Sequence, residues 1–219
     1  MDNFSDFEYE RRFFCENLPE CYVDDSPPNL IIQNYYLAQD GYAIRVRIQS
    51  SQIKVQMSES LNPHELLENY SNSFDLGFIT IKGPQIGGTR YEVEHQIDIL
   101  VAKELVKRGT NAIIKNRYSL WFGLDGWIVD VFGGNNNGLI IAECERLSPV
   151  TNLEIPNFCI CEVTDDKRFS NDGLANVPYT SFKDTFAIEL SNMLKKNPIS
   201  AFSQLFGENS FSSNEDSHI

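Results

Sequence analysis

Charged and apolar side chains alternate with a period of two residues in seven segments of the chain. In one of them, Arg45 and Arg47 alternate with Ile44, Val46 and Ile48. Because successive side chains of a β-strand point to opposite faces, each segment predicts a strand with one charged face and one mainly apolar face. The charged positions comprise seven acids and seven bases: Glu8, Glu10, Glu92, Glu94, Asp130, Glu143 and Glu145, and Arg12, Arg45, Arg47, Lys82, Arg90, Lys115 and Arg117.

Two arrangements of these strands fit the alternation. If the charged faces lie outside, the apolar faces form an ordinary barrel or sandwich core, but like charges then often lie beside one another. In the other arrangement, a closed antiparallel barrel turns its apolar faces outward beneath covering helices, and the charges line a polar tunnel. We favour the tunnel, because alternation this dense has no evident use on an outer surface. An internal salt-bridge network without a ligand is the simpler alternative.

Three helices are predicted, so the fold class is α+β. Asn62 and Pro63 form a capping pattern at the start of a short helix. A second helix is predicted over Ile97–Arg108, and a third over Ser181–Lys196 with Ser181 and Asp184 as its capping pair. The apolar face of the second helix is expected to hold Ile97, Leu100, Val101 and Leu105.

The chain divides into a main domain, residues 1–200, and an acidic end, residues 201–219. Residues 201–219 are rich in Ser, Asn, Glu and Asp, contain no Lys or Arg, and follow the helix-ending pair Asn197-Pro198. They predict a disordered tail. A further segment, Ser50 to Gly77, reads as an insertion without a derivable role.

Composition limits the possible partners. The chain has 219 residues with 18 Lys+Arg against 31 Asp+Glu, a formal charge of −13, which argues against a nucleic-acid or membrane surface. No apolar run reaches the roughly 20 residues that span a bilayer. The first residues lack the basic region of a signal peptide, so we expect a cytoplasmic protein. In that reducing compartment the five cysteines are expected to be free. The seven acids and seven bases cancel (7 − 7 = 0), so the acidic excess lies elsewhere and does not exclude a small polyanion inside the barrel.

The proposed lining has a definite chemistry. Carboxylates without His or Cys suit hard cations such as Mg²⁺ or Mn²⁺. Clustered Arg and Lys suit phosphate oxygens, Arg through bidentate forks and Lys as a point charge. Both in one cavity favour phosphoryl chemistry, in which metal ions bridge phosphates and lower the pKa of an attacking water.

An ordered series of motifs resembles the CYTH domain, or triphosphate tunnel metalloenzyme, superfamily. Glu8-Tyr9-Glu10-Arg11-Arg12 is similar to the opening E-x-E-x-K motif of that superfamily, with Arg12 in place of its lysine. The similarity spans about residues 7–197 and continues in order through Arg45-Val46-Arg47, Thr80-Ile81-Lys82-Gly83, Arg90-Tyr91-Glu92-Val93-Glu94, Lys115-Asn116-Arg117-Tyr118, the segment 127–132, Ala142-Glu143-Cys144-Glu145 and the segment 162–171.

The resemblance implies an eight-stranded antiparallel tunnel barrel with helices outside, acting on a small triphosphate with Mg²⁺ or Mn²⁺. The chain is most like the bacterial inorganic triphosphatase branch, which implies hydrolysis of inorganic triphosphate to diphosphate and phosphate by a metal-activated water. Three alternatives stay open: a class IV-type adenylate cyclase, a thiamine or nucleoside triphosphatase, and a non-catalytic polyphosphate-binding module. A homodimer is also left open.

The resemblance also assigns roles to the fourteen charged positions. The predicted metal ligands are Glu8, Glu10, Asp130, Glu143 and Glu145. The predicted substrate-binding residues are Arg45, Arg47, Lys82, Arg90 and Arg117. The predicted catalytic residues are Arg12, Lys115, Glu92 and Glu94. Tyr36 lies near a tyrosine of the superfamily, but its alignment is ambiguous by one residue.

Overall fold

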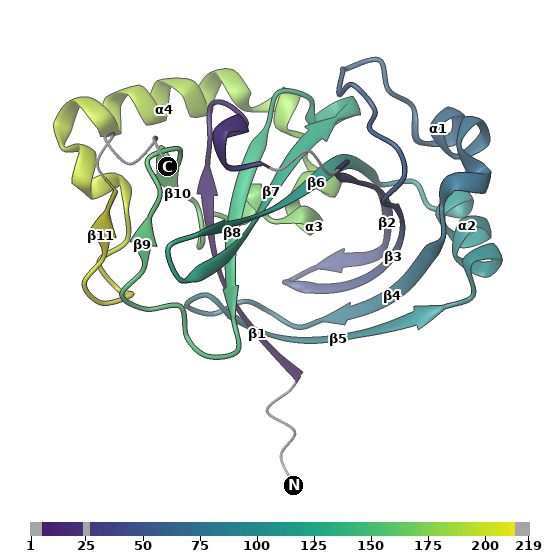
Figure 1. Ribbon diagram of the computed structural model, residues 1–219, viewed down its shortest axis with the longest axis horizontal. Coiled ribbons are helices and arrows are strands. Elements are labelled where there is room, and N and C mark those ends of the chain that lie inside the picture. Colours follow the sequence, from purple (N-terminus) through teal and green to yellow (C-terminus); the bar gives the residue numbers. More distant parts are fainter. Residues whose placement is uncertain (1–5, 24–26, 213–219) are drawn as a thin grey trace, which may run out of the picture.

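The centre of the protein is a closed barrel of antiparallel strands, seen in a computed structural model that describes residues 6–23 and 27–212 (Figure 1). Its strands are β1 Phe7–Phe14, β2 Asn29–Gln39, β3 Tyr42–Ser50, β4 Leu76–Lys82, β5 Thr89–Ile97, β6 Ala112–Phe122, β7 Asp125–Gly133 and β8 Ile140–Arg146. They follow one another in the order β1-β5-β4-β3-β2-β6-β7-β8, and β1 pairs with β8 to close the wall. The prediction of an eight-stranded antiparallel barrel is confirmed.

Three short strands complete the structure around β1. The two-residue strand β10, Cys161–Glu162, pairs with the end of β1, whereas β5 pairs only with its beginning. The strands β9, Glu154–Ile155, and β11, Ser210–Phe211, form a separate parallel pair. One edge of β1 therefore passes from β5 to β10, while the other edge stays beside β8.

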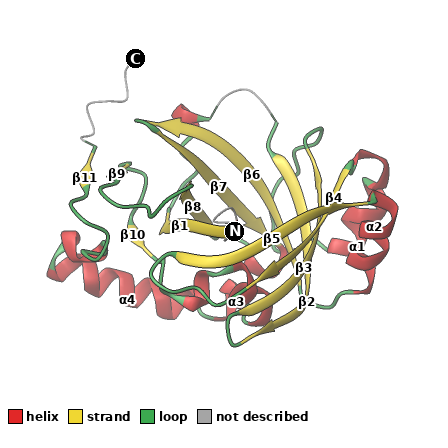
Figure 2. Cartoon of the chain, turned by 90° about the horizontal axis from the view of Figure 1, so that it is seen from below, coloured by secondary structure: helices red, strands yellow, loops and turns green. Residues whose placement is uncertain are grey.

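Helices cover the outside of the barrel. They are α1 Pro63–Asn69, α2 Ile99–Arg108, α3 Asn171–Asn176 and α4 Lys183–Lys196. Shorter 3₁₀ turns lie at Glu20–Tyr22, Ser71–Ser73, Gly134–Asn136, Lys167–Phe169, Tyr179–Ser181 and Pro198–Ala201. Figure 2 shows α1 and α2 on one side of the barrel and α4 on another. None of the helices in the described part of the chain is long and apolar enough to cross a bilayer.

The apolar core lies between the barrel wall and these covers, as the tunnel arrangement predicts. Ile32 and Val46 of β2 and β3 pack with Leu67 of α1 and Ala102 of α2. On another side, α4 buries Phe186 and Leu190 with the following strand and loop residues: Phe14, Ile113, Phe132, Ile141 and Phe169. A third cluster lies under the segment that carries β9 and includes Phe13, Trp127, Val129, Leu153 and Ile155.

The predicted face of α2 is partly wrong: Ile97 and Leu105 pack against the core as expected, but Leu100 and Val101 do not. The structure buries Ala102 and Val106, whereas Leu100 and Val101 are 67% and 53% exposed. The helix begins only after Asp98, whose side chain accepts hydrogen bonds from the first free backbone N–H groups. It then approaches β4 so closely that a Cβ on Gly77 would collide with Ala102, and this contact decides which face is buried.

The other two predicted helices are present. In α1, the Asn62 side chain accepts from two backbone N–H groups and Pro63 takes the first position, as predicted. In α4, the predicted capping pair is wrong, because the helix starts after Phe182 without a side-chain cap. The five cysteines are free as predicted, and all except Cys21 are buried.

The prediction of a disordered tail is wrong for residues 201–212. These residues run along the barrel and add β11 to β9. Arg11, on the outer face of β1, donates to Asn209 at 2.8 Å and lies 4.7 Å from the Phe206 ring centre. Contacts from a distant strand therefore hold this segment, which its local composition does not reveal. Residues 213–219 lie outside the described residues.

Candidate active site

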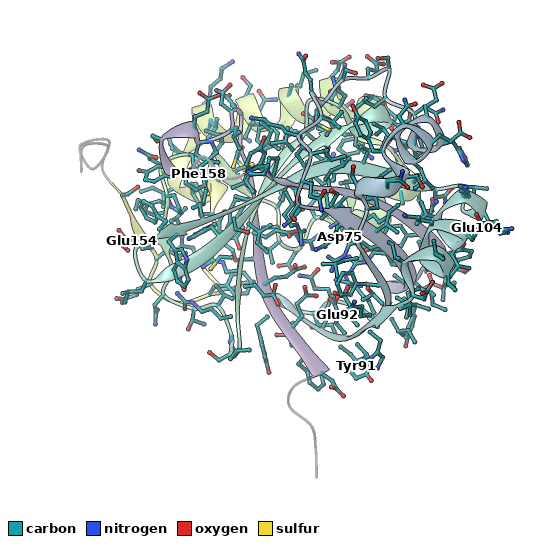
Figure 3. All side chains as sticks on the ribbon, turned by 45° about the vertical axis from the view of Figure 1, so that its right-hand side comes forward. Asp75, Tyr91, Glu92, Glu104, Glu154 and Phe158 are labelled. Carbon is teal, nitrogen blue, oxygen red and sulfur yellow. The ribbon has the colours of Figure 1, made fainter. Side chains whose placement is uncertain are left out.

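A charged cavity of about 430 Å³ occupies the barrel. Its wall contains all the predicted charged positions except Lys115 and Asp130. Alternation along β5 shows how the sequence produces it, since Glu92 lines the cavity while the preceding Tyr91 is 43% exposed outside. Figure 3 shows Glu92 within the barrel opening and Tyr91 at the outer edge. The charged strand faces therefore point inward.

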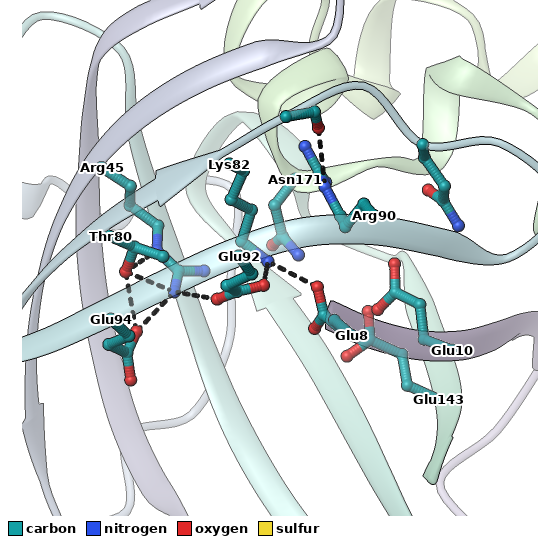
Figure 4. Close-up of polar contacts among 12 residues, drawn as sticks. Glu8, Glu10, Arg45, Thr80, Lys82, Arg90, Glu92, Glu94, Glu143 and Asn171 are labelled. Atoms are coloured by element: carbon teal, nitrogen blue, oxygen red, sulfur yellow. Dashed lines mark hydrogen bonds and ion pairs between the residues drawn. The ribbon is translucent and has the colours of Figure 1, made fainter. Parts of the chain in front are cut away.

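One side of the cavity is a cationic wall, made of Arg45, Arg47, Lys82, Arg90 and Arg117. Glutamates hold three of its members in place, and Glu94 pairs with Arg45 at 2.8 Å and with Arg47 at 2.7 Å. Lys82 lies between Glu92 and Glu8, 3.2 Å from the Glu8 carboxylate (Figure 4). Although burial raises the pKa of Glu8, the opposing effect of Lys82 is part of what brings it below its usual range. Burial and the neighbouring Glu8 raise the pKa of Glu92 to about 8.

Lys115 and Asp130 lie beneath the lining rather than in it. Asp130 is fully buried and accepts a hydrogen bond from Lys115 at 2.6 Å. It also accepts from Nε and from one terminal nitrogen of Arg117, at 2.8 and 2.7 Å. Burial alone would raise the pKa of Asp130, but the two cations lower it overall. Burial, together with Arg117, lowers the pKa of Lys115 to about 8. Asp130 therefore holds two cations of the site.

On the closing side of the barrel, Glu10, Glu143 and Glu145 form an acid seam. In the pairing of β1 with β8, Glu10 lies directly opposite Glu145, and Arg12 opposite Glu143. Like charges placed opposite each other destabilise a strand pair. Among the described residues, the Glu145 carboxylate has no hydrogen-bond or ion-pair partner, and Glu10 has only Arg12, at 3.5 Å.

The pKa values of the acid seam reflect this crowding. Burial raises the pKa of Glu10 to about 7, with Glu8 and Glu143 adding to the effect and Arg12 opposing it. Burial, Glu8 and Glu143 also raise the pKa of Glu145. Within residues 6–23 and 27–212, no three His, Cys, Asp or Glu side chains already converge closely enough to hold a metal ion. Glu143 lies 3.4 Å from Arg117, but Glu145 has no such partner among the described residues. The seam is therefore a set of oxygen ligands that is only partly neutralised, and carboxylate oxygen is the donor type that Mg²⁺ and Mn²⁺ take.

Arg12, which replaces the lysine of the resembling motif, is held from two sides. One of its terminal nitrogens donates to Gln85 at 2.5 Å and to the Thr164 backbone carbonyl at 2.9 Å. Its Nε, which is buried, makes no hydrogen bond within the described residues and lies 3.5 Å from Glu10. The larger arginine therefore spans from the loops around Gln85 and Thr164 to the acid seam.

Several uncharged or unpredicted residues also line the cavity. Tyr35 is buried against it, and burial raises the pKa of its hydroxyl to about 12. Tyr36 points away, is 47% exposed and donates to the Leu105 carbonyl. The ambiguity between the two tyrosines is thus decided for Tyr35; β2 has a register shift between Tyr35 and Leu37 that sequence alignment does not reveal. The other additions are Phe7, Arg146, Leu147, Asn171 and Asp172.

Comparisons with known proteins agree with this architecture. No family model matches the chain. A curated inorganic triphosphatase of Acetivibrio thermocellus is 37% identical over 112 residues, covering 50% of this chain and 72% of that protein. A crystal structure of the inorganic triphosphatase NE1496 is 25% identical with a TM-score of 0.50, covering 77% of this chain and 93% of the other. A second crystal structure of NE1496 is 26% identical with the same TM-score, covering 77% and 97%.

A closed antiparallel barrel with a charged interior defines a class of tunnel proteins. With the relatives above, the chain belongs to the CYTH, or triphosphate tunnel metalloenzyme, superfamily, next to its inorganic triphosphatases.

Proposed function

We propose that this protein hydrolyses inorganic triphosphate to diphosphate and phosphate inside the barrel. The observation that carries the proposal is a cavity lined both by the cationic wall and by the acid seam, in which Glu10 lies opposite Glu145 in the strand pairing. The relatives named inorganic triphosphatase support the same activity.

The lining favours an inorganic substrate over an organic one. Apart from Phe7, Tyr35, Leu147 and Asn171, every described residue of the lining is charged. A nucleoside or thiamine group would need aromatic or amide contacts over most of its surface. A bare triphosphate needs only donors and positive charge, which this wall supplies.

The cationic wall binds the phosphates in this account. Arg45 and Arg47 are already oriented by Glu94, and Arg117 by Asp130, so little conformational freedom is lost when they bind phosphate oxygens. Glu92, Glu94 and Asp130 act by holding cations in position. We therefore leave Asp130 out of the proposed metal ligands and assign Lys115 to a position behind the binding surface.

The acid seam, together with Glu8, is the proposed site for Mg²⁺ or Mn²⁺. A divalent cation would relieve the repulsion between Glu10 and Glu145, which face each other across the strand pair. Held by these carboxylates, a divalent cation would supply positive charge for the phosphate oxygens and would lower the pKa of a water molecule.

The reaction adds one water across the terminal phosphoanhydride bond. The water oxygen bonds to the terminal phosphorus, the bond to the bridging oxygen breaks, and diphosphate leaves with the electron pair as a proton is released. Negative charge on the phosphoryl and leaving oxygens lies next to Arg12 and the cationic wall, which stabilise it electrostatically.

A substrate panel tests this proposal. Purified protein is given inorganic triphosphate, thiamine triphosphate, ATP or longer polyphosphates, with Mg²⁺ or Mn²⁺, and the products are separated. We expect inorganic triphosphate to give the highest kcat/KM and no cyclic nucleotide to form from ATP. Higher kcat/KM with an organic triphosphate, or cyclic nucleotide as the main product, would overturn the proposal. Tight triphosphate binding without turnover would favour the binding module instead.

A further inference from the structure

Asn171 is an uncharged polar residue of the cavity lining, so the roles assigned to the charged residues do not explain it. It begins α3 and lines the cavity. Its Oδ1 accepts one hydrogen bond from Lys115 Nζ at 3.0 Å and another from Gln33 Nε2 at 3.2 Å. Figure 4 shows Asn171 in the close-up of the charged cluster, beside the strands that carry Lys82 and Glu92.

The chemistry of its neighbours fixes which way the Asn171 amide points. The ammonium of Lys115 has donors and no acceptor, so the group facing it must be the Asn171 oxygen. That oxygen only accepts, so Gln33 must turn its Nε2 towards it. Gln33 Nε2 donates its second hydrogen bond to the Tyr35 hydroxyl at 3.1 Å. The hydrogen bonds from Lys115 to Asn171 and from Gln33 to Asn171 therefore fix the orientation of both side-chain amides.

One consequence is that the Asn171 Nδ2 group is directed away from Lys115 and Gln33. Among the described residues, no acceptor takes a hydrogen bond from Nδ2, and it is not among the buried atoms left without a partner. Gln33 Oε1, by contrast, is buried without a partner. Turning Gln33 over would not help, because its oxygen would then face the Asn171 oxygen. Asn171 thus offers two N–H donors on the cavity side.

We infer that Asn171 Nδ2 donates a hydrogen bond to a phosphate oxygen of the triphosphate, and that Lys115 and Gln33 are positioning residues for it. This inference rests on the proposed function. Ionised phosphate oxygens only accept hydrogen bonds, so a fixed amide donor suits them without adding to the repulsion among the cations of the wall. It also gives Lys115, which lies outside the lining, a role that acts through Asn171.

Asn171→Asp isolates this donor. An aspartate oxygen keeps both hydrogen bonds that Oδ1 accepts now, from Lys115 and Gln33, but presents a second oxygen to the cavity in place of the NH₂ group. We expect a melting temperature equal to or above that of the parent, and a fall in kcat/KM for inorganic triphosphate of about a hundredfold, chiefly through KM, since a lost charged hydrogen bond is joined by like-charge repulsion. Asn171→Ala, which removes the donor without adding charge, is expected to lose about tenfold.

The matched control is Asn69→Asp, the same change on the exposed surface of α1, where kcat/KM should stay within about twofold. Parent-like kcat/KM in both Asn171 variants would overturn the inference. Lys115→Met should raise KM in the parent but have little further effect in Asn171→Ala, whereas additive effects would remove Lys115 from its positioning role.

Calorimetry separates this inference from the proposed function. Inorganic triphosphate is titrated into parent and Asn171→Asp protein, each without divalent metal. If the parent binds triphosphate here but shows no turnover once Mg²⁺ or Mn²⁺ is supplied, the hydrolase proposal fails, and an affinity at least about tenfold weaker in Asn171→Asp still supports the Asn171 contact. Equal affinities overturn that contact. Absence of binding by the parent, both without metal and with Mg²⁺ or Mn²⁺ added, overturns both proposals.

Discussion

Glu10 and Arg11 are neighbours on β1, both buried and both charged, yet their surroundings differ in kind. Arg11 points outward and is 0% exposed; it binds the Glu162 carboxylate through two nitrogens at 2.8 and 2.9 Å and lies between Phe13 and Phe206. Glu10 points inward, has one cation 3.5 Å away and lies opposite another glutamate. One charge is fully paired within the chain, and the other is not.

This difference separates structural charges from functional ones. A buried ion pair needs good geometry and complete hydrogen bonding to offset its desolvation, and the pair of Arg11 with Glu162 has both. The carboxylates of the acid seam lack such complete pairing within the protein, so a bound cation would be needed to complete it. Glu10 and Arg11 are alike in burial and in carrying a charge. What distinguishes the functional charge from the structural one is whether it has a complete set of ion-pair and hydrogen-bond partners within the protein.

The largest expected effect is on the acid seam. Glu143→Gln should lower triphosphate hydrolysis by at least about a thousandfold, because a lost metal ligand removes several kcal/mol of transition-state stabilisation. Its melting temperature should change little, because relief of the crowding among the carboxylates offsets the lost ion pair with Arg117. Phosphate release and thermal unfolding measure the two quantities. Glu154→Gln, on the outer surface (Figure 3), is the control and should keep full activity. A Glu143→Gln protein that hydrolyses triphosphate like the parent would contradict the comparison.

Arg11 should show the opposite pattern. Arg11→Met leaves the Glu162 carboxylate buried without its cation, and we expect the free energy of unfolding to drop by about 3–5 kcal/mol. Chemical denaturation measures this, while kcat/KM per folded molecule should stay within about threefold. Adding Glu162→Leu should restore part of the stability, because an apolar pair replaces the unpaired charge. An Arg11→Met protein of parent stability but without activity would reverse the two roles.

Metal ions offer a third way to distinguish the two regions. At a concentration about a hundred times its dissociation constant, a ligand of the folded state adds about 2.7 kcal/mol, or about 5–10 °C in melting temperature for a chain of this size. We expect Mn²⁺ to produce this rise in the parent and in Arg11→Met. Glu10→Gln should show a clearly smaller rise, and a chelator should abolish it. An equal rise in Glu10→Gln would place the cation elsewhere.

The smallest effect is expected on the exposed ion pair of α2. Arg108 pairs with Glu104 on the helix surface, where both side chains are more than half exposed. Solvent screens such a pair, so Arg108→Met should leave the melting temperature unchanged within error. A loss of stability as large as that of Arg11→Met would show that an exposed ion pair stabilises this protein as much as a buried one.

The strand faces were predictable from sequence, because a period of two follows directly from backbone geometry. The period placed Glu92 and Glu94 on one face and Tyr91 on the other, whereas the choice of the inner face for the charges needed the density of the alternation over seven segments. How far each side chain lies from the cavity was not predictable. Lys115 is on the same strand face as Arg117 but does not line the cavity, because Asn171 of α3 accepts a hydrogen bond from it. Alternation assigns a side chain to a face and says nothing of what covers it.

Other errors have equally local physical causes. The register shift in β2 decides that Tyr35 rather than Tyr36 faces the cavity. The start of α2 after Asp98, with the close contact at Gly77, turns Leu100 outward. Residues 201–212 contact distant segments, among them Arg11, almost two hundred positions away, and the strand β9. Each outcome depends on a contact between distant segments, which a single sequence does not display.

Phosphorus NMR of inorganic triphosphate incubated with the purified protein and Mg²⁺ or Mn²⁺ tests the central claim most directly, because it follows substrate and both products at once. The charged barrel, acting as a hydrolase, predicts that the triphosphate signals disappear while diphosphate and phosphate appear in equal amounts, and that Glu143→Gln leaves the substrate intact. Unchanged triphosphate with either metal, or the same turnover in Glu143→Gln, would contradict it.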